Sequence, residues 1–115
     1  MGKIFNLEER TTVFAKAVIN VCKQVPRTPI NDRIVGQVVG ASGSVGANYR
    51  EANDALGKKD FLQRLKIARR ESKESHHWLQ LLAEANSGLT DKIPPLISES
   101  VELKNILSAM IKNSE

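Results

Sequence analysis

The sequence predicts an all-α protein: an antiparallel, up-down-up-down four-helix bundle formed by a single domain over residues 1–115. Four successive segments carry apolar residues at alternating spacings of three and four, which places them on one helical face. The breaks between these segments contain Pro or Gly, which end helices. Aromatic residues make up only 4% of the chain, so Leu, Ile, Val and Ala must fill the core. Short connections then make each helix antiparallel to the one before it.

The first helix is expected to begin at Asn6, a suitable N-cap residue. Glu9 follows three positions later and completes a capping-box pattern. Pro26 and Pro29 end this helix because proline interrupts helical hydrogen bonding. Its predicted core face consists of Leu7, Thr11, Phe14, Val18, Val21 and Val25.

The second helix is expected from about Asn31 to Asn53. Its predicted core face consists of Ile34, Val38, Ala41, Val45, Asn48 and Ala52. The same segment holds Gly36, Gly40, Gly43 and Gly46, and each Gly costs about 1 kcal/mol relative to Ala inside a helix. We expect these glycines to let another backbone approach closely. The alternative is a helix that is bent or irregular near Gly43.

Asp54 to Lys58 form a short connection around Gly57, and the third helix follows. Its core seam has heptad-like spacing and consists of Phe61, Leu65, Ala68, Ser72, Ser75, Leu79 and Leu82. Gly88 is the expected C-terminal stop. If the second and third helices fold back around Leu56, facing residues have numbers that sum to about 113. This register pairs Ala41 with Ser72, where the two helices approach most closely.

The fourth helix is capped by Thr90 or Asp91, and its first turn tolerates Pro94 and Pro95. Its predicted apolar face consists of Leu96, Leu103, Leu107 and Met110. Four isoleucines widen this face: Ile93, Ile97, Ile106 and Ile111.

Two parts of the chain resemble a known family. The first is the run Ser44-Val45-Gly46-Ala47-Asn48-Tyr49-Arg50-Glu51-Ala52; the second comprises Lys59-Asp60-Phe61 and the residues Glu71, Glu74, Trp78, Leu79, Leu81 and Leu82. They resemble the four-helix-bundle proteins encoded in intervening sequences of bacterial large-subunit (23S) ribosomal RNA genes, which are related to the accessory proteins of diversity-generating retroelements. The resemblance implies an antiparallel bundle that assembles into a homopentamer, with a basic surface suited to RNA or DNA. It implies no catalytic residues.

A basic cluster in the third helix is the leading candidate for a nucleic-acid-binding site. Between positions 58 and 73 the only acidic residues are Asp60 and Glu71. The seven basic residues of this segment are Lys58, Lys59, Arg64, Lys66, Arg69, Arg70 and Lys73. Several of them fall, with Gln63, on a stripe opposite the core seam, and such a stripe can follow the phosphates of a polyanion. The alternative is an ordinary solvated helix face. Because no aromatic residues alternate with the cations, sequence-specific stacking on single strands is not expected.

Six further residues are expected to have structural polar roles: Glu71 and Glu74 in a polar layer near Gln37, and Asn48, Arg50 and Glu51 in a network at a helix end or in a subunit contact. Glu71 and Glu74 are expected to be partly buried, with Gln37 near Glu74 or Ser75. Glu74 and His77 match half of a di-iron motif, but the chain has only two histidines, so the ligand count fails. The sequence predicts no catalytic residue, metal or cofactor.

Ile67, Trp78 and Leu81 give the third helix a second apolar side, and a bundle helix must bury both sides. They are therefore candidates for an oligomer interface. Cys22, the only cysteine, has no activating neighbour and is expected to be a half-buried apolar residue. We expect a cytoplasmic protein, because there is no signal-peptide pattern and the longest uncharged run is shorter than a membrane span.

The sequence therefore predicts a non-enzymatic, oligomeric adaptor that binds RNA or DNA through the basic surface of its third helix. The alternative is a protein–protein interaction module, for example an accessory subunit of a reverse transcriptase, in which the basic surface has no direct role in nucleic-acid binding.

Overall fold

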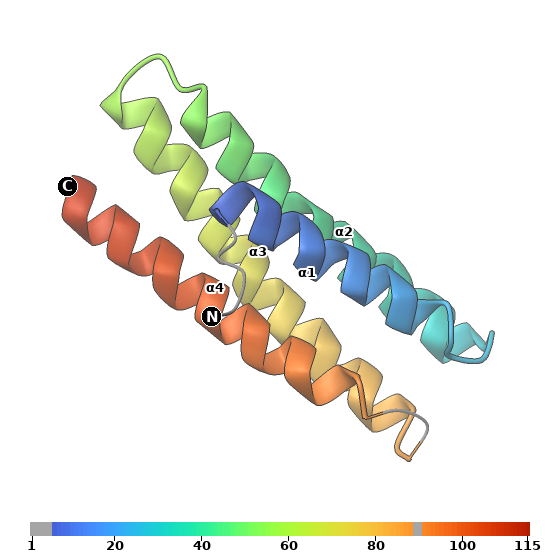
Figure 1. The fold of residues 1–115 in the computed structure, drawn as a ribbon. Helices are drawn as coiled ribbons and strands as arrows, with labels where there is room; N and C mark the ends of the chain where they lie inside the picture. The colour runs from blue at the N-terminus through green and yellow to red at the C-terminus, as the bar shows by residue number, and fades with distance from the viewer. Residues whose placement is uncertain (1–5, 89–90) are drawn as a thin grey trace.

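The computed structural model describes residues 6–88 and 91–115, and this part of the chain forms four helices: α1 (Leu7–Cys22), α2 (Pro29–Asn53), α3 (Lys58–Ala85) and α4 (Ile93–Ser114). Each helix packs against the one before it, and α1 also packs against α4. Figure 1 shows the helices running alternately up and down. The predicted all-α, up-down-up-down architecture is confirmed.

Helix α1 begins as the sequence predicts. The Asn6 side-chain oxygen accepts a hydrogen bond from the Glu9 backbone N–H at 2.7 Å, so Asn6 is the N-cap. The helix ends at Cys22, before either proline, because the Lys23 and Gln24 N–H groups bond the last carbonyls in a closing turn. Val25, predicted to lie on the helical face, is buried from the connection that follows.

Helix α2 begins at Pro29, two residues before the predicted start. Thr28 caps it, since its hydroxyl oxygen accepts from the Asn31 N–H at 3.0 Å. The chain is helical without interruption from Pro29 to Asn53, so the irregular segment considered near Gly43 does not occur in this helix.

The prediction about the glycines of α2 is correct at one position only. A Cβ atom on Gly46 would lie 2.8 Å from the Thr11 hydroxyl oxygen, so α1 and α2 approach closely at this point. Gly36, Gly40 and Gly43 are exposed, and a Cβ atom on any of them would meet nothing within 4 Å. Within the described part of this chain, no backbone approaches these three closely, contrary to the prediction.

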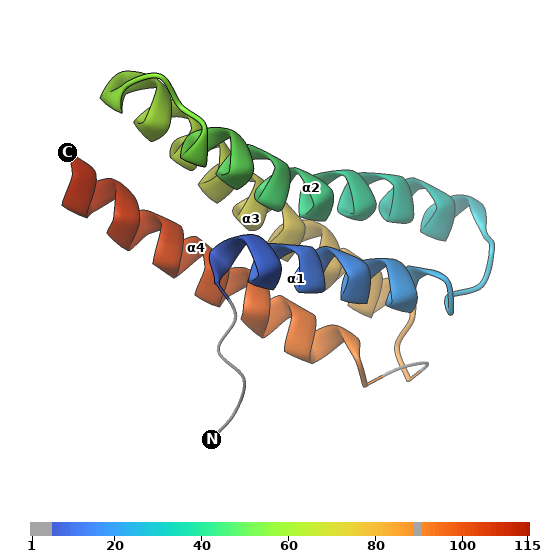
Figure 2. The same ribbon diagram turned by 45° about the horizontal axis from the view of Figure 1, so that its top comes forward.

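The core consists of two clusters arranged along the bundle. The first joins residues from all four helices, including Phe14 and Val18 of α1; its remaining buried members are Val21, Val25, Ile34, Val38, Leu79, Leu82, Ile93, Leu96 and Leu103. The second joins α2, α3 and α4 and consists of Val45, Ala52, Leu65, Ala68, Leu107 and Ile111. Helix α1 reaches this cluster only through half-buried Leu7. Figure 2 shows the reason: α1 is short and lies along one part of the bundle, while α2, α3 and α4 continue beyond it.

A buried pair of asparagines joins the start of α2 to the end of α3. Asn31 and Asn86 each donate a side-chain N–H to the other's side-chain oxygen at 2.9 Å, and both are nearly inaccessible to solvent. The Asn86 amide also donates to the Leu82 carbonyl at 2.9 Å. The predicted register places Leu82 opposite Asn31, whereas the side chain that Asn31 bonds is Asn86, one helical turn further along α3.

The core seam of α3 is buried from Leu65 to Leu82 as predicted, while Phe61 is half-buried. The helix ends at Ala85, three residues before Gly88, which adopts a left-handed conformation (φ 79°) in the connection. Asn48, predicted as a core residue of α2, is only half-buried, and its amide bonds the Ser44 carbonyl of its own helix.

Helix α4 begins at Ile93, and its N-cap is Lys92, so Asp91 does not cap it; Thr90 lies outside the described residues. Pro94 and Pro95 occupy the first turn as predicted. The buried side ends with Ile111, and Met110 is half-buried. The seam therefore advances by four residues from Leu107, where the prediction placed a step of three.

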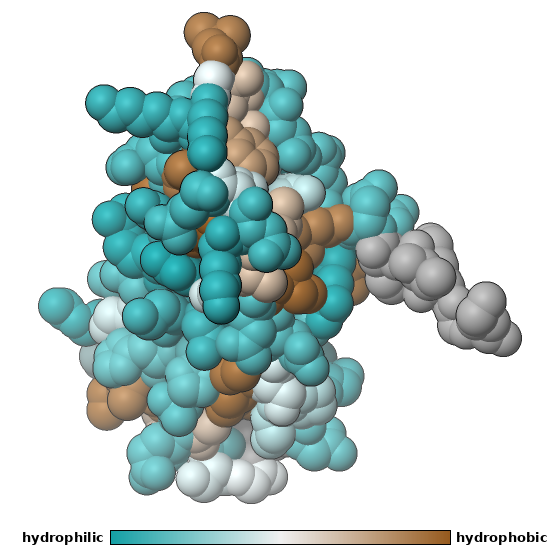
Figure 3. Space-filling view, turned by 90° about the vertical axis from the view of Figure 1, so that its left-hand side faces the viewer, coloured by the Kyte–Doolittle hydropathy of each residue, from teal (hydrophilic) through white to brown (hydrophobic). Residues whose placement is uncertain are grey.

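No helix in the described part of the chain combines the length and apolarity that a membrane span requires. Figure 3 views the side of the molecule on the left of Figure 1. Its surface is mainly hydrophilic, and several separate hydrophobic areas interrupt it.

Candidate nucleic-acid interface

A row of cations follows the side of α3 that faces away from the core. Lys59, Lys66, Arg70 and Lys73 are all exposed, while the seam from Leu65 to Leu82 occupies the opposite side. At 1.5 Å per residue, Lys59 and Lys73 are separated by about 21 Å along the helix axis. We call these four residues the basic row. They form a straight line of positive charge on one rigid element.

Four of the seven predicted binding residues surround one shallow hollow. Lys66, Arg69, Arg70 and Lys73 line it, together with Glu74, His77 and Trp78. The His77 and Trp78 rings meet edge to face, with centroids 5.1 Å apart. We call this concavity the α3 hollow. Its cations come from two successive turns, so several of them can contact neighbouring oxygens of one polyanion.

The other three predicted binding residues lie outside the α3 hollow. Lys58 and Lys59 are exposed in the first turn of α3. Arg64 lies 3.8 Å from the Asp60 carboxylate, one turn earlier on the same helix. Arg64 occupies a different side of α3 from the basic row, and this ion pair partly neutralises its charge.

Glu71 and Glu74 form a carboxyl pair on the flank of α3. The Glu71 side chain is 15% exposed and lies 3.9 Å from the Arg70 guanidinium. Burial raises the pKa of Glu71 above its ordinary value, and the neighbouring Glu74 raises it further by hydrogen bonding and charge repulsion, while Arg70 opposes the shift. Glu71 is therefore partly buried as predicted, whereas Glu74 is exposed.

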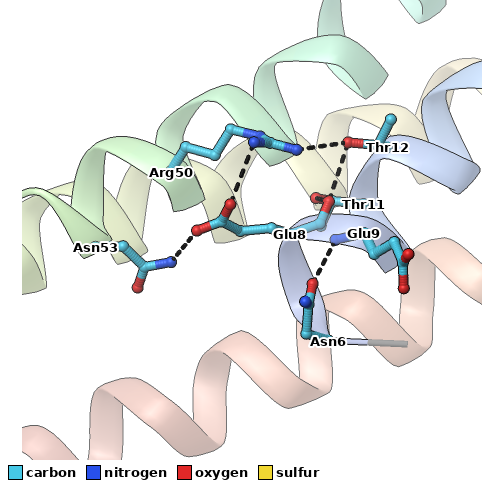
Figure 4. A network of polar contacts seen from close by, with 7 residues as sticks. All are labelled: Asn6, Glu8, Glu9, Thr11, Thr12, Arg50 and Asn53. Carbon is cyan, nitrogen blue, oxygen red and sulfur yellow. Dashed lines mark hydrogen bonds and ion pairs between the residues drawn. The ribbon is translucent and has the colours of Figure 1, made fainter. Parts of the chain in front are cut away.

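Arg50 takes part in a polar network, as predicted, and the network joins α2 to α1. Its guanidinium donates to Glu8 at 3.2 Å and to the Thr12 hydroxyl at 3.1 Å. Asn53 donates to the other Glu8 oxygen at 2.7 Å. Figure 4 shows Glu8 between Arg50 and Asn53. This contact fixes the start of α1 against the end of α2.

The other residues of the predicted polar groups form fewer contacts than expected. Gln37 and Glu51 are exposed, Asn48 bonds within α2, and Glu71 and Glu74 lie on α3. The predicted burial is wrong for Glu74, which is exposed, and among the described residues neither Asn48 nor Glu51 joins the contact of Arg50 with α1.

The candidate interface residues remain close to the surface. Ile67 and Trp78 are half-buried, and Leu81 is 39% exposed. Trp78 packs against the first core cluster, so part of its indole already has an intramolecular role. Cys22 is half-buried as predicted, and burial raises the pKa of its thiol to about 11.

Within the described residues, no group of three or more His, Cys, Asp or Glu side chains is placed to hold a metal ion. What this surface offers chemically is positive charge along α3.

A family model described as 23S rRNA-intervening sequence protein matches residues 5–109 of the chain. The chain belongs to this family. The match spans all of α1, α2 and α3 and most of α4, so it covers the fold and the basic row together. No curated protein matches the chain.

Another structure shows the same fold. A crystal structure of a protein of unknown function from the S23 ribosomal protein family of Bacteroides thetaiotaomicron superposes with a TM-score of 0.80 at 27% sequence identity. The match covers 93% of this chain and 99% of that one. The four-helix fold is thus shared along nearly the full length of both proteins.

This member of the 23S rRNA-intervening sequence family also has contacts that its sequence does not predict. Arg10 of α1 makes two hydrogen bonds of 2.8 Å to the Glu99 carboxylate of α4. With the Arg50–Glu8 contact, this ion pair holds α1 on both of its sides. No local sequence pattern links residues so far apart.

Proposed function

We propose that this protein is a non-enzymatic, oligomeric nucleic-acid-binding protein and that the basic row of α3 contacts the phosphates of structured RNA or DNA. The observation that carries the proposal is the exposed line of Lys59, Lys66, Arg70 and Lys73 on a helix whose opposite side is buried. Because the backbone of α3 is already ordered, binding requires only the long side chains to lose freedom.

The charges of the basic row are largely uncompensated. In the ranges 6–88 and 91–115, Lys59, Lys66 and Lys73 form no ion pair, and Arg70 has only a 3.9 Å contact with Glu71. A nucleic acid that neutralises them releases condensed counterions, which makes binding weaken steeply as salt rises. The net charge of +4 favours the same partner.

An oligomer would strengthen this binding. The family resemblance implies a homopentamer, and Ile67, Trp78 and Leu81 offer partly exposed apolar surface for contacts between subunits. A closed ring repeats the basic row in every subunit, so a long polyanion can bind several rows at once. We expect this assembly in the cytoplasm.

The same apolar surface favours a second candidate function. Trp78 and Leu81 lie beside the basic row on α3, and a protein partner such as a reverse transcriptase could cover both. The protein would then be an interaction module, and the basic row would serve that contact.

Charge reversal tests the proposal. We expect Lys66→Glu, Arg70→Glu and Lys73→Glu together to abolish binding to a duplex or structured RNA, measured by fluorescence anisotropy at two salt concentrations. Each lost phosphate contact lowers the salt slope by about 0.9 for B-DNA, or about 2.7 for three. The fold should persist, because exposed substitutions change stability by about 0.5 kcal/mol or less each.

A matched control separates the site from the total charge. Three reversals change the net charge from +4 to −2, since each changes it by two. Lys16→Glu, Arg33→Glu and Lys112→Glu impose the same change at exposed positions on three other helices. The control should lose much less affinity. Equal losses would show that only net charge matters; unchanged binding in a folded, assembled Lys66/Arg70/Lys73 variant would favour the protein-partner function.

A further inference from the structure

A second hollow lies between α3 and α4. Ser72, Lys73 and His76 of α3 line one side, and Ser100, Val101 and Lys104 of α4 line the other. Its volume is about 230 Å³. We call this concavity the α3–α4 groove. It is large enough for a phosphate group and its hydrating water.

Small residues line the base of the groove on both helices. The neighbouring seam positions of α3, Ala68 and Ser75, are also small, and Ser72 and Ser100 are fully buried. Their hydroxyls donate to carbonyls of their own helices, from Ser72 to Ala68 at 3.2 Å and from Ser100 to Ile97 at 2.6 Å. Both buried hydroxyls are therefore already hydrogen-bonded within their own helices.

The rim of the groove is positively charged. Lys73 and Lys104 stand on different helices, and neither forms an ion pair in the described part of the chain. Two acidic residues of α4 interact with Arg10 of α1. Glu99 forms an ion pair with Arg10, and the charge of Glu102 also helps to raise the pKa of Arg10. The positive charge of Lys104 is therefore available to a ligand in the groove.

The groove is continuous with the candidate interface. Lys73 lines both the α3 hollow and the α3–α4 groove, so the two concavities meet at this residue. A strand whose phosphates contact Lys66 and Arg70 can therefore cross α3 at Lys73 and continue toward α4.

We infer that the α3–α4 groove is a phosphate-binding subsite, in which Lys73 and Lys104 hold a phosphate of the nucleic-acid backbone and His76 borders it. The inference rests on the proposed function, since it extends the path of the same polyanion. It adds α4 to the interface and assigns a binding role to Lys104, a residue outside the basic cluster of α3.

The test uses the full-length protein and the same labelled duplex or structured RNA. Lys104→Gln should weaken binding on the order of tenfold at about 0.1 M salt and lower the salt slope by about 0.9, because one counterion-releasing contact is lost. Lys104→Arg keeps the charge and should bind like the unmodified protein. Lys16→Gln, which removes an exposed charge on α1, is the matched control and should change binding little.

The outcomes separate the inference from the proposed function. If Lys104→Gln behaves like Lys16→Gln while the Lys66/Arg70/Lys73 reversal abolishes binding, the subsite is wrong and the proposed function stands. If neither the triple reversal nor Lys104→Gln affects binding, both are wrong. Equal losses in Lys104→Arg and Lys104→Gln would also overturn the inference, because they would show that packing of the lysine side chain matters and its charge does not.

Discussion

Replacing Gly46 by Ala tests the close approach of α1 and α2. The added Cβ would lie 2.8 Å from the Thr11 hydroxyl oxygen and 3.2 Å from its Cβ atom. Thr11 is fully buried and its hydroxyl donates to the Glu8 carbonyl at 3.0 Å, so it cannot simply rotate away. Helix α1 must shift, and overpacking of this kind costs about 1–3 kcal/mol.

Gly43 provides the matched control. It lies three residues earlier in α2 and is exposed, and a Cβ atom added to it would have no neighbour within 4 Å. Both substitutions gain about 1 kcal/mol from the better helix propensity of Ala. Gly43→Ala should therefore stabilise the protein by about 1 kcal/mol, and Gly46→Ala should be neutral or lose up to about 2 kcal/mol.

Urea denaturation followed by circular dichroism, at fixed protein concentration, measures the difference. Adding Thr11→Ala to Gly46→Ala removes the nearest atom and should recover part of the loss. Equal stabilisation by Gly43→Ala and Gly46→Ala would refute the close approach, because it would mean that α1 yields to the added methyl group without cost.

Three further predictions follow from buried or half-buried polar groups. Asn31→Ala leaves the Asn86 side-chain oxygen without its donor and should cost about 1–3 kcal/mol; in a denaturation double-mutant cycle, the double Ala variant should lose less than the sum of the two single variants. The raised pKa of Glu71 means that its charged form destabilises the fold, an effect absent below its ordinary pKa of 4.5 and present once pH rises through the folded value. Glu71→Gln should therefore raise the denaturation midpoint at neutral pH but not below pH 4.5, and a constant gain at every pH would contradict this cause. With a thiol pKa near 11 against 9.0, native Cys22 should have about a hundredfold less thiolate than a free thiol and react correspondingly slowly with disulfide reagents; reaction as fast as in urea would show that the thiol is not shielded.

The sequence predicts the helices well where an apolar period continues without interruption. The seam of α3 is the clearest case, because its steps from Leu65 to Leu82 alternate regularly between three and four residues and every seam position is buried. Asn31 and Asn86 continue the seams of α2 and α3 by one step each, but they are polar and the apolar period does not include them. The hairpin register pairs residues that sum to about 113, whereas Asn31 and Asn86 sum to 117, so their contact lies one helical turn away from the pairing that the register predicts.

Details that depend on neighbouring helices could not be predicted. Three of the four glycines in α2 face open space, and only the position of α1 distinguishes Gly46 from them. Lys104 reaches the α3–α4 groove from α4, which no spacing within α3 indicates. Sequence spacing gives the face of one helix. It does not give the rotation of two helices against each other, which decides what lines the groove between them.

Because one core cluster joins four helices and the other joins three, the two ends of the bundle differ in local stability. Along α1, a backbone amide of α2 or α3 can exchange only when a four-helix core opens. Near Ala52 and Leu65, an amide can exchange when only three helices separate. Hydrogen–deuterium exchange should therefore be faster at the end of the bundle that contains Ala52 and Leu65. Lys58 and Lys59 belong to the end that opens first, whereas Lys73 and Lys104 border buried Ser72 and Ser100 nearer the middle of the bundle. A bound polyanion that contacts both regions would slow exchange most at the end that opens more readily.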